Sequence, residues 1–192
     1  TYDELAPFYE RVEDEVGVSG LAGNIGGKLT GVGNPFEAPR AKEFPMPPLR
    51  GSGFTDRMSE TAKKLGWHPF APPAAINSRE RNGRSGCVYH GYCATGGCHV
   101  SAKNSTAVST IPEAMKTKNL TIFERSHVRR IEVGSNGKVS GVTYVRDGQE
   151  YFQPAKVVFL ASYTYENVRL LLLSKSKAFP NGLSNNHAQV GK

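Results

Sequence analysis

The sequence of 192 residues is long enough for one hydrophobic core, or one core with an extension, and too short for most two-domain enzymes. Apolar residues make up 38% of it, and Gly and Pro number 21 and 12, so much of the chain is expected to be loop. The net charge of +7 is spread along the sequence, which gives little support to a polyanion-binding protein. The longest apolar run, Val168 to Leu173, is interrupted by Arg169 and falls far short of the ~20 residues of a membrane span.

The first half begins with a helical pattern and continues as loop. Thr1 opens a Ser/Thr-x-x-Glu capping box, and apolar residues follow at helical spacing until Gly17, which is placed to end the helix. Because the sequence starts inside this pattern, with Thr1 and not Met, we expect a piece of a longer protein. Frequent Gly and Pro without helical or strand periodicity predict a long loop from Gly17 to Gly53. A short helix capped by Thr55 and ended by Gly66 is expected next.

The second half has the pattern of a small antiparallel sheet between two helices, Ser109 to Lys116 and Glu166 to Ser174. Asn136-Gly137 and Asp147-Gly148 supply the positive φ that tight hairpin turns need. The expected strands are Leu120 to Glu124, Val128 to Val133, Val139 to Val145, Tyr151 to Gln153 and Val157 to Ala161. We therefore predict an α+β fold: an antiparallel β-meander that leads into one more, buried strand, with short helices and a long Gly/Pro-rich loop.

All three cysteines lie close together, with the spacing Cys-x5-Cys-x4-Cys at Cys87, Cys93 and Cys98. Cysteines of a core would not cluster in a Gly-rich stretch, where a flexible backbone lets several side chains turn toward one centre. Because thiolates are soft ligands, an iron–sulfur cluster or zinc is the natural guest. Three thiolates suit a three-iron cluster, or a zinc or four-iron site with His90 or His99 as an added ligand.

Two other interpretations of these cysteines stay open. The spacing is not the Cys-x2-Cys of zinc ribbons, which lowers the weight of the zinc hypothesis. One disulfide with a spare thiol, or three cysteines without a ligand, would account for the residues equally simply.

Many segments, taken in order along the chain, resemble one enzyme family. The run Cys98 to Thr106, followed by Thr110 to Met115, resembles the middle of the glucose–methanol–choline (GMC) flavoprotein oxidoreductases. More narrowly, it is similar to the branch that contains the large subunits of gluconate, fructose and glucose dehydrogenases. The further matching segments are Tyr2 to Tyr9, Gly17 to Gly20, Asn34 to Glu37, Leu65 to Phe70, Val157 to Ser162 and Asn167 to Ser174.

The resemblance implies an FAD-dependent dehydrogenase that oxidises a CH–OH group of a sugar, sugar acid or alcohol. In the family, the meander and the strand after it belong to the FAD-binding domain. The resemblance places the backbone of Val128 against the flavin's adenine, and Ala161, Ser162 and Tyr163 at the turn that passes the adenosine and pyrophosphate. Residues 1–103 would then hold the N-terminal helix, a cap-like loop region and the cysteine loop, and residues 104–192 part of the FAD-binding domain.

For dehydrogenases of this branch, the resemblance also implies a three-iron, four-sulfur (3Fe-4S) cluster held by Cys87, Cys93 and Cys98. The cluster would relay electrons from the flavin toward a haem cytochrome subunit. The implied partners are the remainder of the same flavoprotein, a small subunit and this cytochrome subunit, with no nucleic acid. The implied location is the bacterial periplasm or the periplasmic face of the inner membrane.

The flavin site is expected to be incomplete in these residues. A Gly-x-Gly-x-x-Gly turn at a helix N-terminus, which would hold the pyrophosphate, and an acidic residue for the ribose are missing from the required strand–turn–helix setting. Tyr163 stands where many relatives carry Gly, and Asn167-Val168 where the broader family has Ser-Pro. None of the five histidines lies in the family's catalytic context, so we assign no catalytic residue and expect the segment to be inactive by itself.

Two alternative functions from other classes are open beside this hypothesis. A binding module derived from such an enzyme would share the sequence pattern and lack chemistry of its own. A basic nucleic-acid binder has only the net charge in its favour, because Arg129 and Arg130 point to opposite faces of a strand and form no basic stripe.

Overall fold

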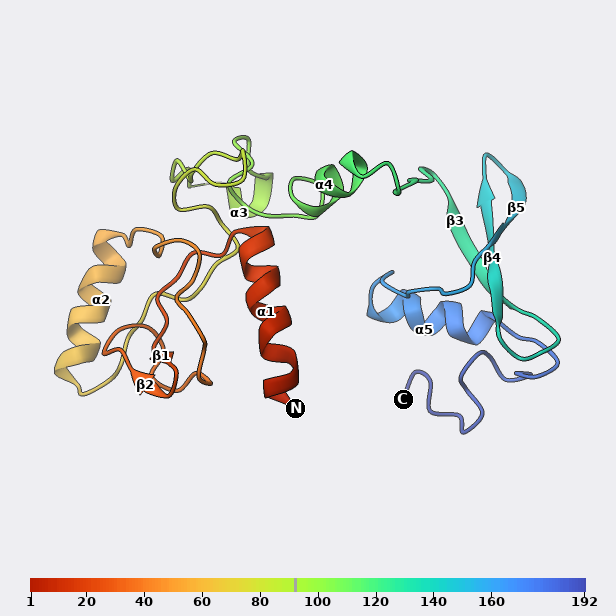
Figure 1. Ribbon diagram of the computed structural model, residues 1–192, viewed down its shortest axis with the longest axis horizontal. Helices are drawn as coiled ribbons and strands as arrows, with labels where there is room; N and C mark the ends of the chain where they lie inside the picture. Colours follow the sequence, from red (N-terminus) through yellow and green to blue (C-terminus); the bar gives the residue numbers. More distant parts are fainter. Residues whose placement is uncertain (92) are drawn as a thin grey trace. The chain divides into compact units, whose positions relative to one another are not determined.

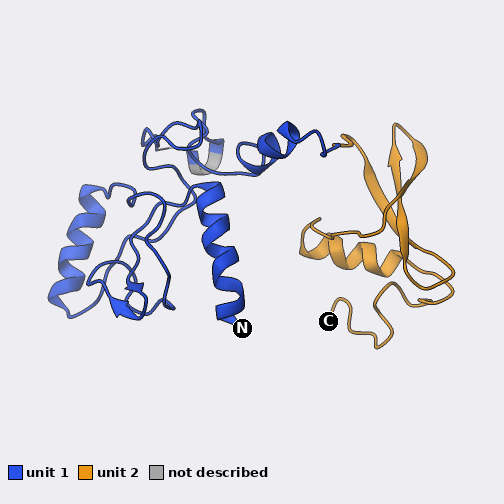
Figure 2. Ribbon diagram, viewed as in Figure 1, with its two compact units in different colours: residues 1–121 blue, residues 122–192 orange. Residues whose placement is uncertain are grey.

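A computed structural model describes residues 1–91 and 93–192, which divide into two compact units, Thr1–Thr121 (unit 1) and Ile122–Lys192 (unit 2) (Figure 2). Helices and antiparallel strands occupy separate segments, so the predicted α+β class is confirmed. Unit 1 contains α1 (Tyr2–Val16), β1 (Asn24–Ile25), β2 (Lys28–Leu29), α2 (Gly53–Lys64), α3 (Cys93–Gly96) and α4 (Thr110–Lys116) (Figure 1). Unit 2 contains β3 (His127–Val133), β4 (Val139–Arg146), β5 (Gln149–Pro154) and α5 (Thr164–Leu173).

The two long helices of unit 1 begin with capping boxes. The Thr1 hydroxyl accepts a hydrogen bond from the Glu4 backbone N–H, the Glu4 carboxylate accepts one from the amino terminus, and Gly17 ends α1 with a φ of 77°, as predicted. In α2 the capping residue is Ser52 and not Thr55. Thr55 is the reciprocal partner three residues later, whose hydroxyl accepts from the Ser52 N–H at 2.7 Å. The helix therefore starts earlier than predicted. The sequence offers two hydroxyl residues, Ser52 and Thr55, that could each act as the cap, and the structure uses Ser52.

The segment from Gly17 to Gly53 is a loop, and contacts between distant residues hold it. Ser19 forms isolated backbone bridges to both Met46 and Ala74, and Ser19 and Met46 are 0% and 1% exposed. β1 and β2 pair as a two-residue hairpin within the loop. The core of unit 1 thus lies under loop segments, and no residue of α1 or α2, which the structure describes in full, is buried.

Carboxylates supply the hydrogen bonds that strands would otherwise give this loop. The Glu43 carboxylate accepts from the Ala22 N–H at 3.1 and 3.2 Å, and Ala22 is 0% exposed. The Glu37 carboxylate accepts from the backbone N–H groups of Gly23 and Asn24 at 2.5 and 3.1 Å. Buried N–H groups need such acceptors, so these two side chains fix the loop around its core.

Unit 2 is the predicted antiparallel meander, with strand order β3-β4-β5 and α5 against β3. Asp147 and Gly148 turn the chain between β4 and β5 with φ of 51° and 78°, as the Asp-Gly signal predicts. The Ser174 hydroxyl joins helix to sheet, because it accepts from the Ile131 N–H at 2.9 Å and donates to the Leu170 carbonyl at 2.6 Å. Ile131 and Leu170, 4% and 3% exposed, form the centre of the apolar core.

Two segments expected as strands are not paired. Leu120 to Glu124 and Val157 to Ala161 run without strand neighbours in the described part of the chain. The second was expected to be buried, yet Val157 and Phe159 are 66% and 92% exposed. An apolar, β-branched pattern reports a preference for a sheet, but a strand forms only where a neighbour supplies the hydrogen bonds.

The division into units falls between Thr121 and Ile122, after α4. The boundary expected between residues 103 and 104 separates functional regions and not compact units, so it stays a prediction. Among the helices of the described residues, none combines the length and the apolar character that a membrane crossing requires.

Glu132 on β3 is expected to make the stability of unit 2 depend on pH. Its carboxylate accepts hydrogen bonds from the Thr143 hydroxyl at 2.5 Å and the Arg130 guanidinium at 2.7 Å. Burial raises the pKa of Glu132, but these bonds outweigh it and hold the pKa below its ordinary value. A carboxyl whose pKa is lower in the folded state stabilises the fold above its unfolded pKa, and the contribution is lost as pH falls through the folded-state value.

We therefore expect Glu132→Gln to lower the free energy of unfolding by about 1 kcal/mol at neutral pH and to flatten its decline in acid. Urea unfolding between about pH 3 and pH 7 measures both effects. Glu150→Gln, at an exposed carboxylate of β5, is the control and should keep the wild-type pH profile. Equal pH profiles for wild type and Glu132→Gln would contradict the assignment.

Candidate functional site

The first residue expected to meet FAD, Val128, is half-buried on β3, opposite Tyr144 of β4. The pairing register shifts between Val128 and Arg130, which is the irregularity of a β-bulge. A bulge releases part of the backbone from the hydrogen-bonded ladder. The main chain beside Val128 is therefore suited to contact a ligand through its own polar groups.

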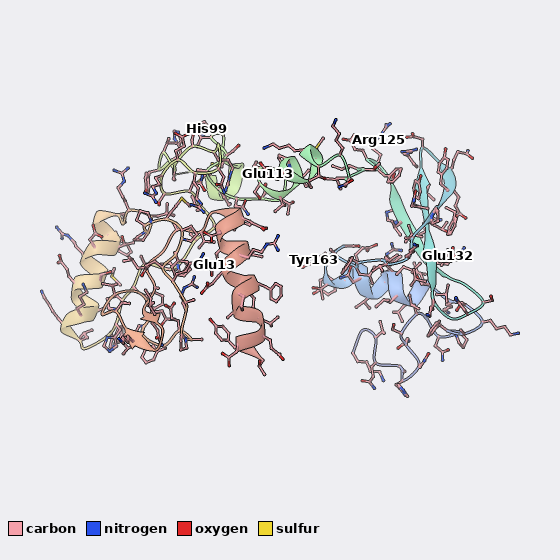
Figure 3. All side chains as sticks on the ribbon, in the orientation of Figure 1. Glu13, His99, Glu113, Arg125, Glu132 and Tyr163 are labelled. Carbon is pink, nitrogen blue, oxygen red and sulfur yellow. The ribbon has the colours of Figure 1, made fainter. Side chains whose placement is uncertain are left out.

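The other three residues, Ala161, Ser162 and Tyr163, form the exposed turn before α5 (Figure 3). The Ser162 N–H donates to Asn167 Oδ1 at 2.9 Å, and Tyr163 has a φ of 82°, a conformation that L-residues rarely adopt. Tyr163 occupies the capping position of α5, and its side chain makes no hydrogen bond to the first turn of the helix. The first N–H groups of α5 are left without intrahelical acceptors, and such an end favours a negative or polar ligand group.

Contacts between β3 and α5 bring these two parts of the predicted flavin site side by side. Arg169 Nη2 lies 3.3 Å from Nε2 of His127, the residue before Val128. Arg169 also donates to the Glu166 carboxylate at 2.6 Å, and this bond holds the pKa of Glu166 below its ordinary value. The sequence did not point to this cluster, because its members lie about 40 residues apart and only the fold brings them together.

The cysteines predicted to bind metal all lie on one loop of unit 1. Cys87, Cys93 and Cys98 are each half-buried, and all three are free cysteines in this structure. Cys87 Sγ accepts a hydrogen bond from the Tyr89 N–H at 3.3 Å, and Cys93 Sγ donates to the His90 carbonyl at 3.5 Å.

Cys98 has the most polar surroundings of the three. Its Sγ accepts from the Lys103 N–H at 3.4 Å, and the backbone N–H groups of residues 100–102 face it as well. These hydrogen bonds, that from Lys103 above all, lower the pKa of Cys98 against the opposing effect of burial. The loop therefore favours a thiolate at this position.

The thiols have the right chemistry for iron, but the described residues do not hold them in a ready-made site. No group of three His, Cys, Asp or Glu side chains in residues 1–91 and 93–192 is gathered closely enough to hold a metal ion. The rings of His90 and His99, the two candidate added ligands, lie with their centroids 4.6 Å apart.

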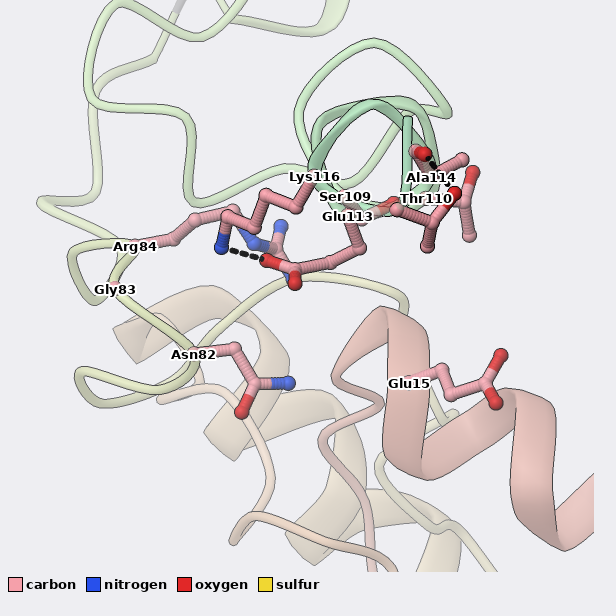
Figure 4. Close-up of a pocket in the computed structure, with 10 residues that line it drawn as sticks. Glu15, Asn82, Gly83, Arg84, Ser109, Thr110, Glu113, Ala114 and Lys116 are labelled. Carbon is pink, nitrogen blue, oxygen red and sulfur yellow. Dashed lines mark hydrogen bonds and ion pairs between the residues drawn. The ribbon is translucent and has the colours of Figure 1, made fainter. Parts of the chain in front are cut away.

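A pocket of about 720 Å³ lies in unit 1 between the C-terminal half of α1, the loop at residues 82–84 and α4 (Figure 4). Lys116 and Glu113 pair across its upper wall at 2.7 Å, and Glu15 lies on the opposite wall. Arg84, only 7% exposed, forms part of the lining. Sequence reasoning missed Arg84, because nothing distinguishes it from the exposed Arg79 in the same basic stretch.

Comparison with known proteins assigns the chain to a family. The sequence pattern described as GMC oxidoreductase matches residues 48–192, so the chain belongs to the GMC oxidoreductase family, a family of oxidoreductase enzymes. The resemblance inferred from the sequence is thereby confirmed.

Several individual relatives are dehydrogenases by name, and others are oxidases. The gluconate 2-dehydrogenase flavoprotein of Pantoea cypripedii is 32% identical over 91% of this chain and 30% of its own length. The 2-methyl-1,2-propanediol dehydrogenase of Mycolicibacterium austroafricanum is 30% identical over 100% of this chain and 33% of its own length. The fructose dehydrogenase large subunit of Gluconobacter japonicus is 29% identical over 100% of this chain and 34% of its own length. The chain thus spans about a third of the length of these relatives.

Proposed function

We propose that this chain is an internal segment of an FAD-dependent dehydrogenase that oxidises a CH–OH group of a sugar, sugar acid or alcohol. The observation that carries the proposal is the family match over residues 48–192, together with relatives whose names specify gluconate, a diol and fructose. When bound, FAD supplies the acceptor for the hydride of the alcohol carbon. The segment would contribute part of the flavin site and no catalytic base, so we expect it to be inactive without the rest of the protein.

Two features of unit 2 support the proposal of a partial FAD site. A backbone bulge beside Val128 and an uncapped helix start after Ala161, Ser162 and Tyr163 lie on neighbouring elements, and both offer main-chain polar groups. Main-chain groups suit the adenine edge and the phosphate oxygens of a dinucleotide, as in other nucleotide-binding folds. The role of this chain would be to hold the adenosine part of FAD, with the principal phosphate clamp supplied from elsewhere.

The proposal extends to a 3Fe-4S cluster at Cys87, Cys93 and Cys98. Support comes from the spacing of three thiols and from the amide groups that favour a thiolate at Cys98. The cluster would connect the flavin with an acceptor, and a small subunit and a haem cytochrome subunit are the proposed partners. The fructose dehydrogenase relative is a large subunit by name, which supports a multi-subunit assembly. The proposed location is the bacterial periplasm or the periplasmic face of the inner membrane.

The flavin part of the proposal is tested on the full-length protein that contains this segment. We expect flavin absorption bands that bleach when a sugar, sugar acid or alcohol is added without an acceptor. Asn167→Ala removes the acceptor that holds the Ser162 N–H, and we expect it to weaken FAD binding about 10-fold, measured by titration of the apoprotein. Asn181→Ala, at an exposed Asn of the same unit, should bind FAD as the wild type does.

A colourless full-length protein that takes up no FAD on reconstitution would overturn the proposal. Equal FAD affinity for Asn167→Ala and Asn181→Ala would leave the protein a flavoenzyme but would remove residues 161–163 from its site.

A further inference from the structure

Helix α1 packs against the rest of unit 1 through its charged side. The Glu13 carboxylate pairs with the Arg40 guanidinium, and Glu10 accepts from the Ala41 N–H at 2.8 Å. Asp14 lies between Lys42 Nζ at 2.5 Å and Arg81 at 3.1 Å. Figure 3 labels Glu13 on the side of α1 that faces the loops of unit 1. Carboxylates at positions 10, 13 and 14 form one stripe of a helix, and this stripe is the attached one.

The apolar side of the same helix points away from that attachment. Leu5, Phe8, Tyr9 and Val12 form a second stripe whose centre lies roughly 140° around the helix from the carboxylates, at 100° per residue. These side chains are 48%, 63%, 52% and 53% exposed, and none of the residues of α1, all of them described, is buried. A surface helix of a globular protein ordinarily buries its apolar stripe and exposes its charges, so α1 is docked the opposite way round. A contiguous exposed apolar surface of this kind marks an interface.

From this inverted docking we infer that the apolar stripe of α1 is an interface for the remainder of the same flavoprotein chain, through an apolar surface. The relatives extend well beyond this segment, which covers only 30–34% of their lengths, so most of such a protein lies outside residues 1–192. The inference rests on family membership and this coverage, and it does not depend on the proposed chemistry.

The carboxylates beside the stripe already have partners, so its exposed apolar side chains decide what kind of surface can cover it. Glu4 and Glu15 flank it on one side; their side chains, 76% and 48% exposed, pair with the amino terminus at 2.6 Å and with Arg11 at 2.7 Å. A partner surface with a large apolar centre suits the aromatic rings of Phe8 and Tyr9.

A photo-reactive side chain tests which polypeptide covers the stripe. In the full-length protein, Phe8→p-benzoylphenylalanine should cross-link on irradiation to a peptide of the same polypeptide that lies outside residues 1–192. The apparent mass of the chain in a denaturing gel should stay unchanged. A cross-link to a second copy, to another subunit or to residues within 1–192 would overturn the inference, and so would the absence of any cross-link.

Thiol labelling measures whether the stripe is covered. In the native full-length protein, Val12→Cys should react with a thiol reagent at least about 10-fold more slowly than Arg11→Cys, a factor equal to about 1.4 kcal/mol of opening free energy. Arg11 is the matched position because it neighbours Val12 on the same helix and its side chain is 75% exposed. Peptide mapping separates these sites from the three native cysteines, and circular dichroism shows that both variants are folded.

Equal labelling rates at the two positions would show that the stripe is open to solvent and would overturn the inference. Neither experiment reads out flavin or turnover, so a failure here leaves the proposed function standing, and a protein without flavin would leave this interface standing.

Discussion

Replacement of Arg84 by Met is expected to destabilise unit 1 by about 3 kcal/mol, because it leaves buried acceptors without a donor. The guanidinium donates to the Val16 carbonyl at 2.5 Å, to Asn77 Oδ1 at 3.2 Å and to the Ser101 carbonyl at 3.3 Å. It thus joins the end of α1, a buried Asn and the segment that follows Cys98. No carboxylate among the described residues pairs with it, and burial lowers the pKa of Arg84. The negative end of the helix dipole at Val16 offsets part of this cost.

Two further variants separate geometry from charge. Arg84→Lys keeps the positive charge, but an ammonium group cannot reach three acceptors on three segments, so we expect an intermediate loss of stability. Arg79→Met removes an exposed guanidinium from the same stretch and should change stability by no more than about 0.5 kcal/mol.

Chemical unfolding of the full-length protein gives the free energies, and hydrogen exchange locates the effect. Amides near Val16 and Ser101 should lose protection in Arg84→Met, while those of β3 and β4 keep theirs, because the two units have separate cores. A free energy for Arg84→Met equal to that for Arg79→Met would contradict the role assigned to Arg84.

Features that depend on neighbouring residues could be predicted from the sequence. The ends of α1 follow from the capping box at Thr1 and from Gly17, and the turn of the β4–β5 hairpin follows from Asp147-Gly148. In each case the deciding hydrogen bond or dihedral angle lies within four residues, so the local sequence contains the whole cause.

Features that depend on distant partners could not be predicted. The pattern of Val157 to Ala161 indicates a strand, but strand formation requires a neighbour that the described residues do not provide. In the loop from Gly17 to Gly53, the backbone N–H groups of residues 22–24 donate to Glu37 and Glu43, and others donate to isolated carbonyls, so no regular ladder imposes a periodic pattern. A carboxylate 14 or 21 residues away leaves no periodic trace in a sequence.

The candidate site likewise combines features that could be predicted from the sequence with features that depend on distant contacts. The resemblance selected Val128 and residues 161–163, and the fold places them on adjoining elements. It gave no indication of the contact between His127 and Arg169 that joins those elements. For the cysteines the spacing predicted which residues are close along the chain, but spacing in a Gly-rich loop does not determine where three Sγ atoms point.

Cys93→Ser in the full-length flavoprotein is expected to abolish electron delivery to an acceptor subunit while substrate still reduces the flavin. A serine oxygen is a harder ligand than a thiolate and binds the iron of a cluster poorly, so protein-bound iron and sulfide should be lost. FAD would be retained, because the proposed flavin residues lie in unit 2 and Cys93 lies in unit 1. We expect transfer to the acceptor to fall at least about 100-fold, more than second-shell changes around metals typically cause.

Three measurements distinguish a cluster ligand from a residue that merely supports the loop. Iron and sulfide content, together with an electron paramagnetic resonance spectrum, reports whether the cluster is present. Bleaching of the flavin band by substrate reports the first half-reaction. Reduction of the acceptor reports the second half-reaction. Val88→Ala changes a 52% exposed side chain of the same loop and should leave all three unchanged. Cys87→Ser and Cys98→Ser should repeat the pattern of Cys93→Ser, because a cluster held by three thiolates loses a ligand in each case.

If wild type and Cys93→Ser contain equal iron and reduce flavin and acceptor at equal rates, the cluster assignment is wrong. A fall in flavin reduction together with acceptor reduction would instead give Cys93 a structural role, as the first residue of α3.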